Sequence, residues 1–166
     1  MVDAGKRATR VLLVDDEEDL VEYLSRRMVK RGYVVRAVTC GKDAVRAATE
    51  ETFDVAVVDL KMPVMDGIAV IKKLKDHQPF IETIMLTGHG SHESALEAGK
   101  IQTHRYLLKP YDFEKLIEEV DAAAAARREA LAAEFQREVK RVMDGSTSAH
   151  EIMEETERLR RKYEQP

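Results

Sequence analysis

The stretch Val55-Ala-Val-Val-Asp59 constrains the fold most, because four consecutive apolar residues run directly into a single acid. A short apolar run of this kind, bounded by turn residues, is typical of a fully buried strand in a parallel sheet. Pro63 and the pair Asp66-Gly67 follow within a few positions and favour a loop. We therefore expect the carboxylate of Asp59 to lie at the carboxyl edge of the sheet, where open α/β sheets bind ligands.

A second apolar run, Val11–Val14, ends in the same way on the adjacent acids Asp15 and Asp16. The carboxyl ends of parallel strands lie on one edge of a sheet, so these acids and Asp59 are expected to converge. Converging carboxylates repel one another unless a cation lies between them, and an all-oxygen site on short loops suits Mg²⁺ or Mn²⁺. As an alternative, Asp15 and Asp16 only cap the following helix, where acids interact favourably with the helix dipole.

Two later apolar runs end on a hydroxyl and on an ammonium group: Thr87 follows Ile84–Leu86, and Lys109 follows Tyr106–Leu108. Taken singly, Thr87 is an ordinary strand former and Lys109 an ordinary loop charge. The set of strand ends is more specific than any one of them. A hydroxyl and a cation beside a metal-binding carboxylate can neutralise a phosphoryl group and donate hydrogen bonds to its equatorial oxygens.

On these residues, the chain from Arg10 to about Val120 resembles the receiver domain of bacterial two-component response regulators. The resemblance rests on the stretches VLLVDDEED, VVDLKMPVMDG, MLTG and YLLKP. The alternation of strands and helices predicts an α/β fold with a parallel sheet covered on both faces. The resemblance implies a doubly wound, five-stranded flavodoxin-like (βα)5 sheet of order 2-1-3-4-5. It also implies a phosphorelay, in which a histidine kinase or a phosphotransfer protein phosphorylates the receiver and a protein-protein interaction surface switches in response.

By the same resemblance, Asp59 is the phosphoacceptor, and it binds Mg²⁺ or Mn²⁺ together with Asp16. The other implied roles are the backbone carbonyl of Lys61 as a metal ligand, Asp15 at the metal site acting largely through water, Thr87 and Lys109 as holders of the phosphoryl oxygens, Tyr106 as an aromatic switch and His89 as a residue that tunes dephosphorylation. Alternatively, His89 is an ordinary exposed loop histidine. We expect self-phosphorylation and autodephosphorylation only, not turnover of a separate substrate.

An aspartyl-phosphate hydrolase is the leading alternative from another functional class, because such enzymes also use a strand-end aspartate with Mg²⁺. They resemble one another in carrying a second acid two residues after the nucleophile. In this chain that position is Lys61. A lysine cannot act as a carboxylic general acid, which argues against the hydrolase.

Beyond the receiver, the sequence stays helical. We assign residues 1–121 to the receiver and residues 122–166 to a helical extension of no recognised family. Neither Pro nor Gly interrupts Phe113–Met143, which as one helix would be roughly 46 Å long. Asp144–Ser148 is expected to break this helix, and a second amphipathic helix is expected to run to about Glu164. In a third functional hypothesis this extension is a helical scaffold, and the receiver is its regulatory handle.

Each extension helix carries a narrow apolar stripe that needs cover. The stripes consist of Leu131, Phe135, Val139, Val142 and Met143 in the first helix and Ile152, Thr156, Leu159 and Tyr163 in the second. We favour self-association in a homodimer, as in a coiled coil, because narrow stripes do not build a separate core. The alternative is an intramolecular hairpin in which Leu159 and Tyr163 fold over Phe135 and Leu131.

Composition excludes several other classes. Of 166 residues, 44% are apolar, which is enough for one core. A net charge of −4 and a pI near 5.8 give no basic footprint, so we expect no direct binding to nucleic acid. The single cysteine, Cys40, cannot form an internal disulfide. Without an apolar leader or a long apolar span, we expect a cytoplasmic protein that does not bind membranes.

Overall fold

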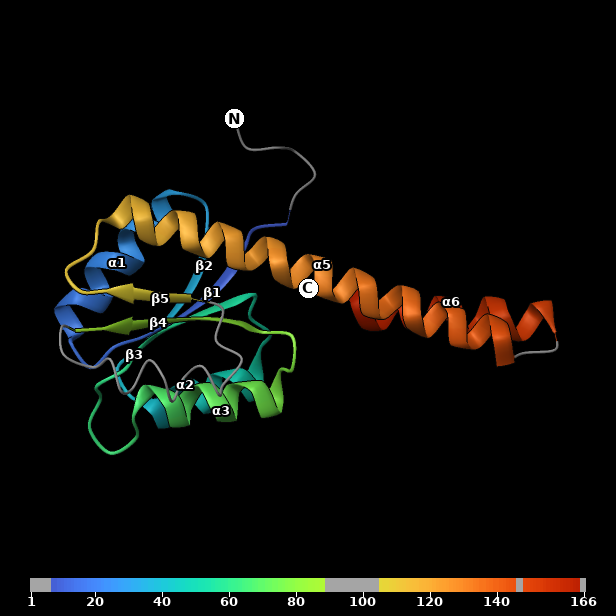
Figure 1. The fold of residues 1–166 in the computed structure, drawn as a ribbon, viewed down its shortest axis with the longest axis horizontal. Helices are drawn as coiled ribbons and strands as arrows, with labels where there is room; N and C mark the ends of the chain where they lie inside the picture. The colour runs from blue at the N-terminus through green and yellow to red at the C-terminus, as the bar shows by residue number, and fades with distance from the viewer. Residues whose placement is uncertain (1–6, 89–104, 146–147, 165–166) are drawn as a thin grey trace. The chain divides into compact units, whose positions relative to one another are not determined.

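The computed structural model describes residues 7–88, 105–145 and 148–164, and the chain divides into two compact units, Met1–Ala125 and Ala126–Pro166. The first unit contains a five-stranded parallel sheet of order β2-β1-β3-β4-β5 (Figure 1), which confirms the expected fold and strand order. Its strands are β1 (Arg10–Val14), β2 (Val34–Val38), β3 (Val55–Asp59), β4 (Glu82–Thr87) and β5 (Arg105–Leu108).

Helices cover both faces of this sheet. They are α1 (Glu18–Lys30), α2 (Gly41–Glu50), α3 (Gly67–His77) and α5 (Phe113–Gly145). Helix α1 and the first part of α5 lie on one face, and α2 and α3 lie on the other (Figure 1). After α1 the chain turns at Gly32, whose φ of 92° is left-handed and costs glycine little. Helix α3 begins where the Asp66 side chain accepts a hydrogen bond of 2.8 Å from the Ala69 backbone N–H.

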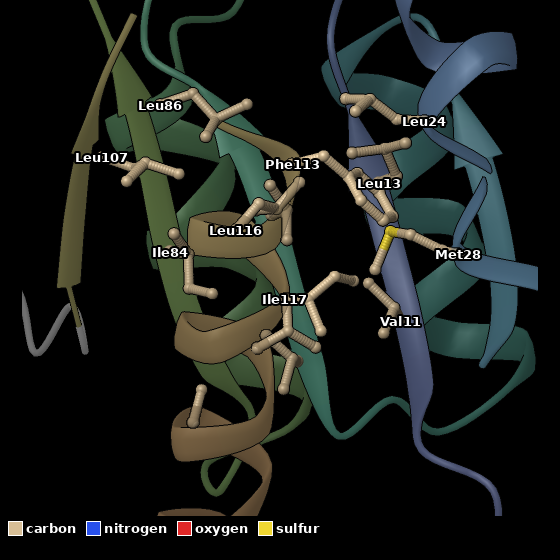
Figure 2. Close-up of a cluster of buried hydrophobic side chains, with 14 of the residues drawn as sticks. Val11, Leu13, Leu24, Met28, Ile84, Leu86, Leu107, Phe113, Leu116 and Ile117 are labelled. Atoms are coloured by element: carbon tan, nitrogen blue, oxygen red, sulfur yellow. The ribbon is translucent and has the colours of Figure 1, made fainter. Parts of the chain in front are cut away.

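The central strands β1 and β3 are buried on both faces, which explains their unbroken apolar sequences. Successive side chains alternate between two cores: Val11 and Leu13 face α1 and α5, whereas Leu12 and Val14 face α2 and α3. Figure 2 shows the first of these cores, with Leu116 of α5 among the side chains that fill it. Burying a leucine fully, as here, stabilises the fold by about 1.5–3 kcal/mol.

The second unit is a pair of helices, formed by residues 126–145 of α5 and by α6 (Ala149–Glu164). The rings of Phe135 and Tyr163 meet edge to face with centroids 6.0 Å apart, and Leu159 is buried. At the start of α6, Ser148 Oγ accepts a hydrogen bond of 3.2 Å from the His150 N–H. The intramolecular hairpin, which sequence analysis gave as the less favoured alternative, is therefore present, and self-association stays a prediction.

The structure also bears on whether a helix of this chain could cross a membrane. Within residues 7–88, 105–145 and 148–164, no helix combines the length and the apolar character that crossing a bilayer requires.

Candidate functional site

Parallel pairing brings the predicted strand ends to one edge of the sheet. Val14 of β1 pairs with Val58 of β3, so the next residues, Asp15 and Asp59, leave their strands at the same level. One strand further, Thr87 ends β4 beside the last residue of β5, directly before Lys109. The acids, the hydroxyl and the ammonium group therefore meet at the carboxyl edge of the sheet, because each immediately follows or ends its strand.

Three carboxylates form the centre of the site. Asp15, Asp16 and Asp59 each offer an oxygen atom within 4.8 Å of the others. Asp15 and Asp59 are buried, whereas Asp16 is exposed. Beside them lies an open hollow of about 540 Å³, and Asp16, Lys61 and Asp66 are among the residues that line it. A cluster of hard oxygen donors with one open side fits Mg²⁺, which keeps several of its waters when protein carboxylates bind it.

Lys109 bridges the two buried acids. Its Nζ lies 2.8 Å from Asp15 Oδ2 and 2.8 Å from Asp59 Oδ1, and it lies 3.8 Å from Glu17 Oε1. The backbone N–H of Lys109 donates to the Thr87 carbonyl at 2.7 Å, which holds this residue at the end of β5. The peptide between Lys109 and Pro110 is cis.

The charges around Lys109 keep its side chain protonated. Burial alone would lower the pKa of Lys109, but hydrogen bonds to Asp15 and Asp59 outweigh it and raise the pKa above the ordinary value. For Asp59, burial raises the pKa, the hydrogen bond from Lys109 lowers it and the charge on Asp15 raises it, and the net change is upward. Asp59 is therefore a carboxylate of increased basicity held against a permanent cation.

The remaining predicted residues are arranged around this centre. Thr87 is buried, and its Oγ1 lies 3.3 Å from the Gly88 carbonyl oxygen, to which it donates. Lys61 lines the hollow, and its backbone also hydrogen-bonds the Asp59 carboxylate, which contributes a lowering of that pKa. Tyr106 lies on β5, paired with β4, and is 36% exposed. His89 lies outside the described residues, so its predicted role has no structural counterpart here.

Gly67 contributes to the site in a way that sequence reasoning missed, because the pair Asp66-Gly67 was interpreted only as a turn. The Gly67 N–H donates to the Leu60 carbonyl at 3.0 Å. A Cβ at Gly67 would lie 2.3 Å from the backbone oxygen of Asp59, far closer than any real contact. The first turn of α3 therefore packs directly against the backbone of the predicted phosphoacceptor.

Two further residues near the acids were also missed. Glu17 donates its backbone N–H to Asp15 Oδ1 at 3.0 Å, which orients that buried carboxylate. The Tyr111 hydroxyl is buried and has no hydrogen-bond partner among the described residues. Burial, with smaller effects from Lys109 and the neighbouring acids, raises the pKa of Tyr111 to about 12. In the sequence, the only signals were that Glu17 directly follows Asp16 and that Tyr111 lies two residues after Lys109.

Comparisons with known proteins agree with this geometry. The family model of the response regulator receiver domain matches residues 11–121. The transcriptional regulatory protein ZraR of Salmonella typhimurium is 37% identical over 119 residues, covering 72% of this chain and 27% of the relative. The transcriptional regulatory protein PrrA of Mycobacterium bovis is 31% identical over 126 residues, covering 76% of this chain and 54% of the relative. The chain thus spans about a quarter to a half of these relatives.

Solved structures show the same likeness. A structure described as adenylate cyclase from Rhodopirellula baltica superposes with a TM-score of 0.75 at 28% identity, covering 80% of this chain and 98% of that one. A response regulator receiver domain protein from Clostridium thermocellum superposes with a TM-score of 0.70 at 27% identity, covering 74% and 98%. With a family model matched over most of its length, this chain belongs to the response regulator receiver domain family.

Proposed function

We propose that this protein is a response regulator of a phosphorelay, in which Asp59 accepts a phosphoryl group from a histidine kinase or a phosphotransfer protein. The observation that supports this most is the position of Lys109 Nζ, 2.8 Å from both Asp59 and Asp15, in an acidic cluster whose exposed member, Asp16, lines an open hollow. A nucleophilic carboxylate, a fixed cation and a space for the incoming group are the parts that phosphoryl transfer requires.

In the proposed reaction a carboxylate oxygen of Asp59 forms a bond to phosphorus, and the bond from phosphorus to the donor histidine nitrogen breaks. The leaving imidazole keeps the electron pair of that bond and takes up a proton. Lys109 would then release Asp59 Oδ1 and bind a phosphoryl oxygen, while Asp15 keeps the ammonium group in place. Thr87, at the end of the next strand, would donate its hydroxyl to another phosphoryl oxygen.

Mg²⁺ fits the same site. The carboxylates of Asp16 and Asp59 and the backbone carbonyl of Lys61 would hold it, and Asp15 would act largely through water. When bound, Mg²⁺ neutralises the charge that develops on the phosphoryl oxygens. Mn²⁺ could replace it, since both cations prefer oxygen ligands.

Phosphorylation would be read out through Thr87 and Tyr106. When the Thr87 hydroxyl moves to the phosphoryl group, the space it leaves would let the partly exposed Tyr106 ring reposition on β5 and change the surface presented to a protein partner. His89 would tune how fast the phosphoryl group is hydrolysed. We place this activity in the cytoplasm and propose no direct contact with nucleic acid or membranes.

The second compact unit, Ala126–Pro166, supports a further proposal about the output that the receiver controls. Residues 126–145 of α5 and helix α6 form a helical pair of their own, which suits a protein-protein output better than a catalytic one. We propose that this pair is the scaffold or dimerisation element that the receiver regulates.

Intact-mass spectrometry of the full-length protein with acetyl phosphate and Mg²⁺ tests the phosphoacceptor. We expect one added phosphoryl group on the wild type and none on Asp59→Asn. Asp66→Asn is the matched control, because Asp66 lines the same hollow and asparagine caps a helix as well as aspartate does. An Asp59→Asn protein that gains the group at the wild-type rate would contradict the assignment.

A further inference from the structure

The Tyr111 hydroxyl is a buried polar group that the proposed reaction does not use. Its oxygen is shielded from solvent and has no hydrogen-bond partner within residues 7–88, 105–145 and 148–164. A buried hydroxyl without a partner is destabilising, because folding removes the water that bonded to it. Such groups are few in folded proteins, and each calls for an explanation. The position of this hydroxyl relative to the phosphorylation site supplies one.

The Tyr111 ring has an open side and a packed side. It lines a hollow of about 620 Å³ together with Lys109 and with residues of α1, among them Leu20. The ring also packs against the apolar core that contains Leu13 and Leu116. Because solvent does not reach the hydroxyl oxygen, a small molecule in the hollow cannot bond to it unless the ring moves. A partner for this hydroxyl therefore has to be a group of the chain itself.

Charged groups of the phosphorylation site lie near this hydroxyl. Only Pro110 separates Tyr111 from Lys109, so their side chains leave the backbone at neighbouring points. Burial raises the pKa of Tyr111 to about 12, and the charge of Lys109 has the next largest effect, a lowering. The acids Asp15, Asp59 and Glu17 have smaller, raising effects. Since electrostatic effects decrease with distance, this order indicates that the ammonium group is the nearest charge. The hydroxyl stays neutral at physiological pH, and its oxygen is able to accept a hydrogen bond from that group.

The ammonium group of Lys109 changes partners in the proposed reaction. In this structure its Nζ lies 2.8 Å from both Asp15 Oδ2 and Asp59 Oδ1. On phosphorylation it would release Asp59, keep Asp15 and bind a phosphoryl oxygen. An ammonium group has three N–H donors, so a third acceptor can join these two. Glu17 Oε1 lies 3.8 Å away, beyond the length of a hydrogen bond, and its side chain is 68% exposed. The buried Tyr111 oxygen is the neighbouring acceptor that needs a donor.

We propose that Tyr111 is a positioning residue for phosphoryl transfer, whose hydroxyl oxygen accepts a hydrogen bond from the Lys109 ammonium group when that group turns to the phosphoryl oxygen. Asp15, Tyr111 and the phosphoryl group would then hold the ammonium group in one orientation. Because the hydrogen bond forms only in the phosphorylated state, it stabilises that state over the free protein. The inference rests on the proposed function, since it requires phosphorylation of Asp59.

Tyr111→Phe tests the proposal, because it removes the hydroxyl and keeps the ring. Beryllofluoride with Mg²⁺ serves as a stable mimic of the phosphoryl group on Asp59. Tyr23→Phe is the matched control, since Tyr23 lines the same hollow and its hydroxyl already accepts a hydrogen bond of 2.8 Å from Arg27. Urea unfolding of the full-length proteins at a series of beryllofluoride concentrations measures two quantities: the stability of the free protein and the dissociation constant of the mimic.

We expect Tyr111→Phe to weaken beryllofluoride binding about tenfold, the effect of one hydrogen bond to a charged group, and Tyr23→Phe to leave it unchanged. Without beryllofluoride, Tyr111→Phe should unfold at a urea concentration equal to or above that of the wild type, because the lost hydroxyl had no partner.

An unchanged dissociation constant in Tyr111→Phe, or an equal loss in Tyr23→Phe, would overturn the proposal. A free Tyr111→Phe protein that unfolds at a clearly lower urea concentration would also overturn it, since the hydroxyl would then have a partner before phosphorylation. A wild type that binds no beryllofluoride would instead contradict the phosphoacceptor proposal, and this inference with it.

Discussion

Gly67→Ala offers a test of how α3 positions the phosphoacceptor. The added Cβ would lie 2.3 Å from the Asp59 backbone oxygen, and 3.0 Å from the Asp59 carbonyl carbon and the Leu60 Cα. All three are backbone atoms of the end of β3 and the residue after it, so no flexible side chain can move aside. The methyl group can be accommodated only if α3 or the end of β3 moves.

Gly41→Ala is the matched control, since Gly41 is also the first residue of its helix. Its added Cβ would lie 2.7 Å from Val70 Cγ2 and 3.0 Å from Met65 Sδ, which are side-chain atoms, and the unbranched Met65 side chain can move aside. Overpacking costs about 1–3 kcal/mol, and we expect Gly67→Ala to reach about 3 kcal/mol because its contacts are with backbone. For Gly41→Ala we expect a smaller cost, because the Met65 contact can relax and alanine has a higher helix propensity than glycine.

Urea unfolding of the two variants and the wild type measures this difference. A loss of about 3 kcal/mol is a change of more than 100-fold in the folding equilibrium, well above the error of the extrapolation. Because α3 or the end of β3 must move, phosphorylation by acetyl phosphate should also slow in Gly67→Ala and not in Gly41→Ala. Equal stability of the two variants, or a Gly67→Ala protein that is phosphorylated normally, would refute the packing argument.

Two further predictions concern ligand and pH linkage. Mg²⁺ at 100 times its dissociation constant should raise the free energy of unfolding by about 2.7 kcal/mol. Asp16→Asn should lose this gain in stability, since Asp16 belongs to the acidic cluster. An unchanged gain in the variant would exclude Asp16 as a ligand. The Tyr33 hydroxyl donates to Asp121 Oδ1 at 2.6 Å, and burial together with this bond raises the pKa of Tyr33 above its ordinary value of 10.0. Its stabilising effect of about 1 kcal/mol is therefore present below pH 10 and is lost as the pH rises through the folded-state pKa. The stability difference between wild type and Tyr33→Phe should shrink above pH 10, and a difference that grows there would contradict the assignment.

The strand ends were predictable because they follow from local rules. An unbroken apolar run ending on a functional group is a signal within a few residues, and Asp15, Asp59, Thr87 and Lys109 all carried it. Parallel pairing then converts separate strand ends into one site without further information. The end of α5 at Gly145, inside the segment Asp144–Ser148 that was expected to break the helix, and the start of α6 after Ser148 followed equally from turn and capping residues.

The features that could not be predicted from the sequence are contacts between segments that lie far apart along the chain. The bridging position of Lys109 between two acids and the contact of Gly67 with the Asp59 backbone are of this kind. The preference for self-association over a hairpin had the same origin. An apolar stripe indicates that cover is needed, but not whether Tyr163 of the same chain or a second copy supplies it.

The position of the acyl phosphate tests the central proposal most directly. Reduction of the phosphorylated full-length protein with borohydride converts a phosphorylated aspartate into homoserine, and peptide mass spectrometry then locates that residue. We expect homoserine at Asp59 alone, formed only when Mg²⁺ is present during phosphorylation, because this carboxylate belongs to the acidic cluster and lies 2.8 Å from Lys109. Homoserine at Asp15 or Asp16 with none at Asp59, or a phosphoryl group that borohydride does not remove, would contradict the account.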